Sequence, residues 1–242
     1  MKVLIANRGE IATRVMKTCR ERGIPTVAIY SDVDAKNPHV WMADEKYCIG
    51  EPREYLNIEK VILAAQVMGA TAIHPGYGFL SENKEFAQRC KEEGIVFIGP
   101  SPESMDAFAN KSSARLLAEK VGVPIVPGAE TCDTPEQAKK LANDIGYPVL
   151  LKAAAGGGGK GMRKVFEESE IEEAFESASR EGLTSFGDGS LLLEKYVYPA
   201  RHIEVQILGD GVKAIAVGER ECSLQRRYQK VLEEAPAEIS VQ

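Results

Sequence analysis

The sequence predicts an α/β protein with three parts: a doubly wound parallel-sheet domain, a small α+β lobe, and the truncated start of an antiparallel-sheet domain. Three observations predict it. Short apolar runs alternate with amphipathic helical patterns over the first hundred residues. A Pro- and Gly-rich stretch near residue 125 then interrupts this rhythm. Further on, Gly-Asp-Gly at 209–211 separates two strand-like runs, which is a hairpin signal.

The first domain is predicted to contain five strands and three helices, and the helices are expected to end at Gly23, Gly69 and Gly94. Its first strand-to-helix turn reads ANRGEIA at 6–12 and lacks the G-x-G-x-x-G fingerprint, which argues against a dinucleotide site. The strands are expected at 2–6, 26–30, 46–49, 71–74 and 96–98, and the helices at 10–22, 57–68 and 82–93.

A helix with at most one break is expected at 101–121, and a second unit is expected to begin near residue 125. Two S/T-x-x-E/Q capping boxes, at Thr134 and Ser169, predict helix starts in that unit. Its elements are helix 134–145, strands 148–153 and 162–166, helix 169–180 and strand 190–197. The domain boundaries that follow are 1–110, a connecting helix and hinge at 111–124, a lid subdomain at 125–197, and the start of the next subdomain at 198–242.

Composition restricts the class of partner and the compartment. The formal charge of −6 argues against nucleic acid, which is bound by a basic excess. The five cysteines form no C-x-x-C pair, so a disulfide framework is not indicated and a cytoplasmic location is expected. The longest weakly polar run, 61–73, is too short to cross a bilayer, and we expect no association with membranes.

The run AAAGGGGKGMR at 153–163 is the strongest local signal. Four consecutive glycines are costly to order, so the segment is either a mobile linker or a backbone that approaches a ligand closely. A linker fits poorly between two predicted strands of one lobe. Lys160 is followed by Gly161 rather than Ser or Thr, so the run is not a Walker A loop. A glycine-rich hairpin over phosphates, able to close as a lid, fits better.

Charged residues near this loop have two interpretations. Lys152 ends the strand that enters the loop, and Glu194 and Lys195 end a later strand of the same lobe. They could neutralise and orient a phosphate ligand, or they could be ordinary solvated surface charges. In the predicted strand 202–208, polar and apolar residues alternate, which places His202 and Glu204 on one polar face. That face, too, could simply be exposed to water.

At this point several motifs together resemble the biotin carboxylase family of the ATP-grasp superfamily, which forms the biotin-carboxylating component of acetyl-CoA, pyruvate and related carboxylases. The resemblance runs in order along the whole chain. HPGYGFLSEN and QRRYQKVLEEAPA are the most specific of these motifs. They stand alongside ANRGEIA, FIGPS, GGGGKGMR, EKYV and RHIEVQ.

The resemblance implies roles for individual residues. Lys111 and Lys152 would contact the phosphates and base edge of ATP, Gly158 and Gly159 would cover the phosphates, and His202 would lie near the ribose or phosphates. Lys230 would hold bicarbonate as the catalytic residue of this segment. Tyr228, placed with the nucleotide site, stands where the family usually has histidine. The adenine would be lined by Glu194, Lys195, Tyr196 and Val197.

The implied reaction is phosphoryl transfer from ATP, with Mg²⁺ or Mn²⁺, to bicarbonate. The carboxyphosphate that results then carboxylates biotin on a carrier protein. Partners implied are the biotin carboxyl carrier protein, the carboxyltransferase component and a second copy in a homodimer. The family's metal-binding glutamates lie beyond the matching segment, so the 242 residues alone are expected to be inactive. Two alternatives stay open: a non-catalytic nucleotide-binding or subunit-interaction module, and another ATP-grasp ligase such as a carbamoyl phosphate synthase half.

Overall fold

The computed structural model describes residues 1–109, 111–155, 161–226 and 229–238. The chain divides into two compact units, Met1–Val123 and Pro124–Gln242. Within the described residues, no helix is long and apolar enough to cross a membrane.

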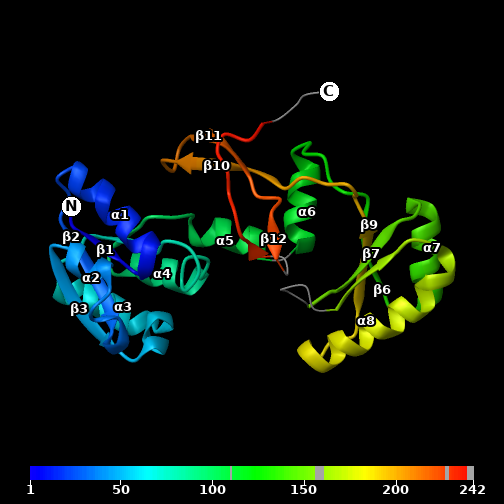
Figure 1. Cartoon of the computed structure of the whole chain (residues 1–242), viewed down its shortest axis with the longest axis horizontal. Coiled ribbons are helices and arrows are strands. Elements are labelled where there is room, and N and C mark those ends of the chain that lie inside the picture. Colours follow the sequence, from blue (N-terminus) through cyan, green and yellow to red (C-terminus); the bar gives the residue numbers. More distant parts are fainter. Residues whose placement is uncertain (110, 156–160, 227–228, 239–242) are drawn as a thin grey trace. The chain divides into compact units, whose positions relative to one another are not determined.

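The amino-terminal unit contains the predicted parallel sheet. Its strands are β1 (Val3–Ile5), β2 (Thr26–Ser31), β3 (Glu45–Gly50), β4 (Ala72–His74) and β5 (Val96–Phe97). They are all parallel and lie in the order β3-β2-β1-β4-β5. Figure 1 labels β1, β2 and β3 of this sheet together with its helices α1 to α4. The chain leaves β1 in one direction for β2 and returns to the other side of β1 as β4, so the predicted doubly wound topology is confirmed.

Helices cover both faces of this sheet. One core cluster joins buried residues of α1 to β1 and β2, and the other joins α3 and α4 to the opposite face. The expected helix ends at Gly23, Gly69 and Gly94 are confirmed by left-handed backbone at all three glycines. The helix expected at 101–121, with at most one break, is described as α5 and α6 on either side of residue 110. The short α2 was missed because five residues show no periodicity. The bounds are α1 Gly9–Glu21, α2 Pro38–Met42, α3 Ile58–Val67, α4 Lys84–Glu92, α5 Pro102–Ala109 and α6 Lys111–Lys120.

The second unit begins with a four-stranded antiparallel sheet and two helices, which we call the lid lobe (residues 128–196). Its strands are β6 (Gly128–Cys132), β7 (Val149–Ala153), β8 (Met162–Val165) and β9 (Leu191–Lys195), in the order β6-β9-β7-β8. Its helices are α7 (Pro135–Ile145) and α8 (Ile171–Phe186). Strand β6 was not predicted, because its sequence GAETC has no apolar alternation.

Strand alternation gives the lid-lobe sheet two different faces. Val149, Leu151 and Ala153 of β7 pack with Leu191 and Leu193 of β9 against α7 and α8. The residues between them point the other way, onto a side that neither helix of the lobe covers. We call this side the open face, and its members on β7, β8 and β9 are Leu150, Lys152, Met162, Lys164, Leu192 and Glu194.

The two predicted capping boxes behave differently. The Thr134 hydroxyl accepts from the amide of Gln137 at 3.3 Å and caps α7 as expected. The box at Ser169 is wrong, because a 3-10 turn at Glu168–Glu170 precedes α8 and the Ser169 hydroxyl donates to Glu167 instead.

We therefore expect Thr134→Ala to lower the free energy of unfolding by about 1 kcal/mol through loss of the helix cap. Ser169→Ala, the matched control, should change it by a few tenths of a kcal/mol at most. Urea unfolding followed by circular dichroism measures both values. Equal losses in the two variants would contradict the capping assignment.

After the lid lobe the chain forms the predicted hairpin, β10 (Ile203–Gly209) and β11 (Ala214–Glu221), followed by the short pair β12 (Gln225–Arg226) and β13 (Gln229–Lys230). The hairpin register shifts between Gln206 and Ile207, which marks a bulge. Most apolar side chains of the ribbon are exposed, including Val205 and Ile207. A two-stranded ribbon with exposed apolar side chains is marginal by itself.

Candidate functional site

The open face of the lid lobe brings together two of the predicted site residues. The ammonium group of Lys152 donates to the carboxylate of Glu194 across the neighbouring strands β7 and β9. Both side chains are about a quarter exposed, at 26% and 22%. A partly shielded ion pair of this kind can exchange one partner for a ligand phosphate, because lysine keeps three donors.

The glycine segment starts and ends beside this pair. Its base is closed by hydrogen bonds from the Ala153 amide to the Gly161 carbonyl at 3.0 Å and from the Ala154 amide to the Ser190 carbonyl at 2.9 Å. Gly161 has φ +67°, and a Cβ there would lie 2.7 Å from Cβ of Ala153. The base therefore requires glycine at 161. Gly158 and Gly159, predicted to cover phosphates, lie outside the described residues.

Two apolar residues of the open face were missed by sequence reasoning. Met162 and Leu192 are the register partners of Lys152 on its two neighbouring strands, and both are half-buried. In sequence they read as ordinary core positions of a strand. Only the pairing of β7 with both β8 and β9 shows that they flank the lysine. Together they give a flat apolar surface beside a cation, which suits a planar base with attached phosphates.

The remaining residues of the predicted adenine wall have other contacts. The Lys195 ammonium donates to the carbonyls of Gly146 and Tyr147 at 2.8 Å each, which ties β9 to the end of α7. The ring of Tyr196 lies edge-on to Phe166, with the Lys164 ammonium 4.7 Å from its centroid. Val197 is exposed. The side chains of Lys195 and Tyr196 thus hold the segment in place.

Residues predicted farther along the chain form a separate charged group. The Glu204 carboxylate accepts from Lys230 and from Arg220, and these two hydrogen bonds lower the pKa of Glu204 to about 2. His202 is exposed, with its Nδ1 3.1 Å from the Gln225 amide nitrogen. Tyr228 lies outside the described residues. Lys111 is the first residue of α6, in the amino-terminal unit.

A magnesium site would require several oxygen ligands close together. Within the described residues, one group of potential ligands lies close together: Glu204, Cys222 and Glu233. Mg²⁺ prefers oxygen ligands in octahedral geometry, and a thiol does not fit that preference. Glu204 is moreover already neutralised by two cations. This group does not fit Mg²⁺, and we assign it none.

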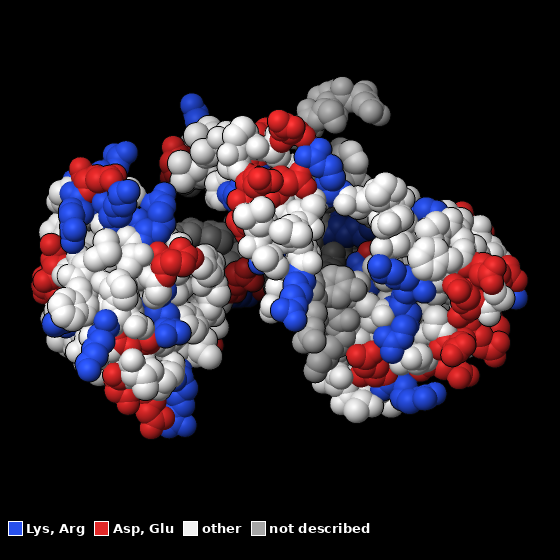
Figure 2. All heavy atoms as spheres, viewed as in Figure 1, with Lys and Arg blue, Asp and Glu red and all other residues white. Residues whose placement is uncertain are grey.

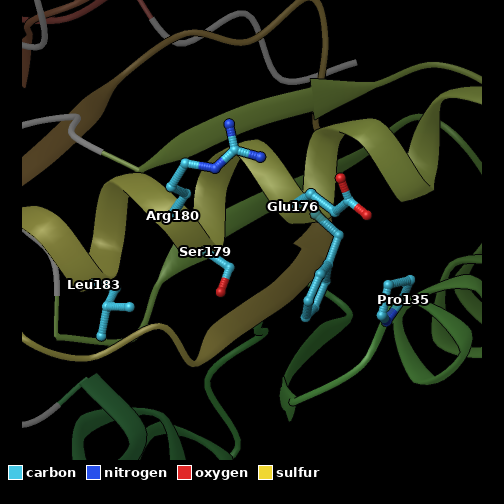
Figure 3. A pocket seen from close by; sticks show the side chains of 6 residues that line it. Pro135, Glu176, Ser179, Arg180 and Leu183 are labelled. Carbon is cyan, nitrogen blue, oxygen red and sulfur yellow. The ribbon is translucent and has the colours of Figure 1, made fainter.

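The helix side of the lid lobe is a weaker candidate. A shallow depression there is lined by Pro135 of α7 and by residues of α8 that include Phe175, Arg180 and Leu183. Figure 3 shows Pro135, Arg180 and Leu183 around it. Figure 2 shows acidic side chains on the side of the lobe where α8 begins, and residues 167–176 include six glutamates. This negative charge disfavours the binding of a polyanion on the helix side. The open face is therefore the better candidate for binding a polyanionic ligand.

In the amino-terminal unit, an ion pair takes the place where a doubly wound domain binds dinucleotides. The guanidinium of Arg8, in the β1–α1 turn, donates to the buried carboxylate of Asp34, which follows β2. A nucleotide ribose would need that acidic group. In this structure Arg8 already occupies the carboxylate of Asp34.

The same turn fixes a loop that follows β4. Asn7 is buried and donates to the carbonyls of Pro75 and Tyr77 at 2.7 Å each. The hydroxyl of Tyr77 donates to Glu10, and Phe79, with φ +42°, stacks on Tyr55 at 5.0 Å. A small pocket lies between this turn and this loop. It opens at the carboxyl ends of β1 and β4, where ligands of such sheets bind.

Two family models match the chain in succession. Residues 1–105 match "Biotin carboxylase, N-terminal domain", and residues 110–240 match "Carbamoyl-phosphate synthase L chain, ATP binding domain". Among curated relatives, Biotin carboxylase 2 of Bacillus subtilis is 53% identical over 98% of this chain and 54% of its own length. The mitochondrial propionyl-CoA carboxylase alpha chain of Sus scrofa is 51% identical over 98% of this chain and 33% of its own.

Solved structures give the same picture. The biotin carboxylase of Campylobacter jejuni in a β,γ-ATP complex matches with a TM-score of 0.87 and 50% identity, covering 98% of this chain and 54% of that one. The biotin carboxylase domain dimer of Hydrogenobacter thermophilus 2-oxoglutarate carboxylase, with MgADP, ADP and bicarbonate, matches with a TM-score of 0.84 and 50% identity, covering 98% and 53%. The chain thus spans about half the length of these solved chains, and about half and one third of the length of the two curated relatives.

Proposed function

We propose that this chain, which belongs to the biotin carboxylase family and contains that family's N-terminal and ATP-binding domains, binds ATP for the bicarbonate-dependent carboxylation of biotin. The Lys152–Glu194 pair carries this proposal, because it places an exchangeable cation between two apolar residues and beside the base of the glycine segment. Phosphoryl transfer depends mainly on positioning and charge neutralisation, which such a face supplies.

Each group on the open face has a separate role in this proposal. Met162 and Leu192 support the adenine ring of ATP. Lys152 binds a phosphate or the edge of the adenine, and the glycine segment covers the phosphates. The backbone of residues 194–197 lines the adenine. Lys230 holds bicarbonate, and Glu204 fixes its ammonium group in place. His202 and Tyr228 would belong to the same nucleotide site, as the family resemblance implies.

The whole protein would work with a biotin carboxyl carrier protein and a carboxyltransferase, as a homodimer. The solved Hydrogenobacter thermophilus domain is described as a dimer, which supports the last point. The five cysteines are free thiols, which supports a reducing compartment, and we place the protein in the cytoplasm. We propose the domain division 1–110, 111–124, 125–197 and 198–242, whose first boundary lies near the junction of the two family models.

The proposal is tested on a chimera that joins residues 1–242 to the remaining part of Bacillus subtilis biotin carboxylase 2. We expect ADP release that requires both bicarbonate and free biotin, and that is lost with Lys230→Gln. Calorimetry on residues 1–242 alone should show ATP binding. A rate of ADP release that is the same with and without biotin would contradict the proposal.

A second candidate function is favoured by one observation, the match of residues 110–240 to the ATP-binding domain of a carbamoyl-phosphate synthase. That reaction also consumes ATP and bicarbonate but needs an ammonia source and no biotin. If ammonium ions replaced biotin in the assay above, this candidate would be the correct one. The match of residues 1–105 favours the biotin reaction.

A further inference from the structure

A histidine in the amino-terminal unit is buried without a partner. His39, on the short helix α2, has an exposed fraction of 0%. Neither of its ring nitrogens makes a well-formed hydrogen bond, although the ring lies near the backbone of Ile29 and the carboxylate of Asp34. Buried polar groups are normally satisfied, so a fully buried and unpaired imidazole requires an explanation.

The carboxylate that acts on His39, Asp34, is the centre of a polar cluster. Asp34 accepts from the Ser31 hydroxyl at 2.8 Å, the Asn37 amide at 2.6 Å and the Tyr55 hydroxyl at 3.0 Å, and also from Arg8. We call these five residues the Asp34 cluster. Asn37 is also the N-cap residue of α2, so the cluster and the helix of His39 are joined covalently.

The surroundings of His39 contain few charges. Asp34 and Arg8 act on it from the Asp34 cluster, with opposite signs. Helix α1 contributes Arg20, whose guanidinium donates to the Met42 carbonyl at the end of α2, and Asp44 beyond α2 accepts from Thr26. The part of β2 at 27–29 is apolar and buried. An imidazolium formed here would have one anion within reach, Asp34, which is already shared among four donors.

We propose that protonation of His39 changes the conformation of the amino-terminal unit. The imidazolium either attracts Asp34 away from Arg8 or leaves its buried position. Helix α2 is displaced in both cases. Arg8 lies next to Asn7, which holds the loop at 75–79. The change is therefore transmitted to that loop. The inference concerns this unit alone and does not depend on the proposed function.

Linkage sets the direction and the pH window. Burial lowers the pKa of His39 in the folded protein below its ordinary value of about 6.5. The unfolded or opened state therefore takes up the proton first. The free energy that favours the state with His39 buried has its full value above about pH 6.5. It decreases as the pH falls from there toward the lower pKa of the folded protein. Asp34 does not titrate in this window, because its donors keep its pKa below the usual value.

The chain contains its own reporter. Trp41 is its single tryptophan, lies two residues from His39 on α2 and is 76% exposed. The experiment follows the indole signal of Trp41 by NMR and fluorescence, and the three histidine rings by NMR, from pH 7.5 to 5.0. We expect a Trp41 transition whose midpoint coincides with the titration of His39 and lies below about pH 6.5.

Two variants and one control decide the outcome. His39→Leu and His39→Gln should abolish the Trp41 transition, and His39→Leu, which places an apolar group in an apolar site, keeps the test valid if the glutamine variant is unstable. His74→Gln, in the same unit and half-buried, should retain it. A transition that survives in both His39 variants, or a wild-type Trp41 signal that is constant over the whole range, overturns the proposal.

Discussion

Replacing Lys152 by glutamine is expected to weaken ATP binding by about tenfold or more while the fold is preserved. A hydrogen bond to a charged group contributes about 1.5–3 kcal/mol, and one factor of ten is about 1.4 kcal/mol. The variant also leaves the Glu194 carboxylate without its cation, on the same face as the phosphates. The repulsion that results adds to the loss. Isothermal titration calorimetry with ATP measures it.

A matched control is available on the other side of the lobe. Lys139 of α7 pairs with Glu168 at 2.7 Å, so Lys139→Gln removes the same charge from an ion pair on the helix side. We expect its ATP affinity to equal that of the unmodified protein. Unchanged affinity in Lys152→Gln, or equal losses in both variants, would remove Lys152 from the nucleotide site.

The Lys152–Glu194 pair shows how far the sequence could predict the site. The place of Lys152 at a strand end beside glycines, and the match to family motifs, identified both residues, but each could equally have been a solvated charge. Their contact depends on the register of β7 with β9, which pairs Leu150 with Glu194. Met162 and Leu192 were missed for the same reason: apolar residues in strands are typical of cores, and only the sheet shows which face they occupy.

The fold was predicted well where the signal was local. The alternating strands and helices of the first domain and the Gly209–Gly211 hairpin follow from periodicity and turn residues. Strand β6 does not, because it is a strand only through pairing with β9, some sixty residues later. The start of α8 was placed two residues early for another reason. The Ser169 motif satisfies a sequence rule, but Ser169 lies within the 3-10 turn that precedes the helix.

Gly128, the first residue of β6, leads to the second prediction. The Pro-Gly stretch that contains it was predicted to mark the start of the second unit, and Gly128 is paired with Glu194 in the lid-lobe sheet. Its φ is +105°, and an added Cβ would lie 2.6 Å from the Leu193 carbonyl oxygen and 2.7 Å from Cα of Glu194. Both atoms belong to the backbone of β9. They cannot move without disturbing the strand that carries Glu194.

Gly128→Ala is therefore expected to lower the free energy of unfolding of the lid lobe by about 2–4 kcal/mol, from positive-φ strain and overpacking together. ATP affinity should also fall, because displacement of β9 moves Glu194 relative to Lys152. Gly187→Ala is the matched control: Gly187 ends α8 in the same lobe with φ +75° and ψ 7°, and nothing lies within 4 Å of an added Cβ. It should lose only about 1–2 kcal/mol, the strain alone, with unchanged ATP affinity. Urea unfolding and calorimetry on both variants measure these effects. If Gly128→Ala proved no less stable than Gly187→Ala, the close approach of β6 to β9 would be contradicted, and with it the way this strand fixes Glu194 on the open face.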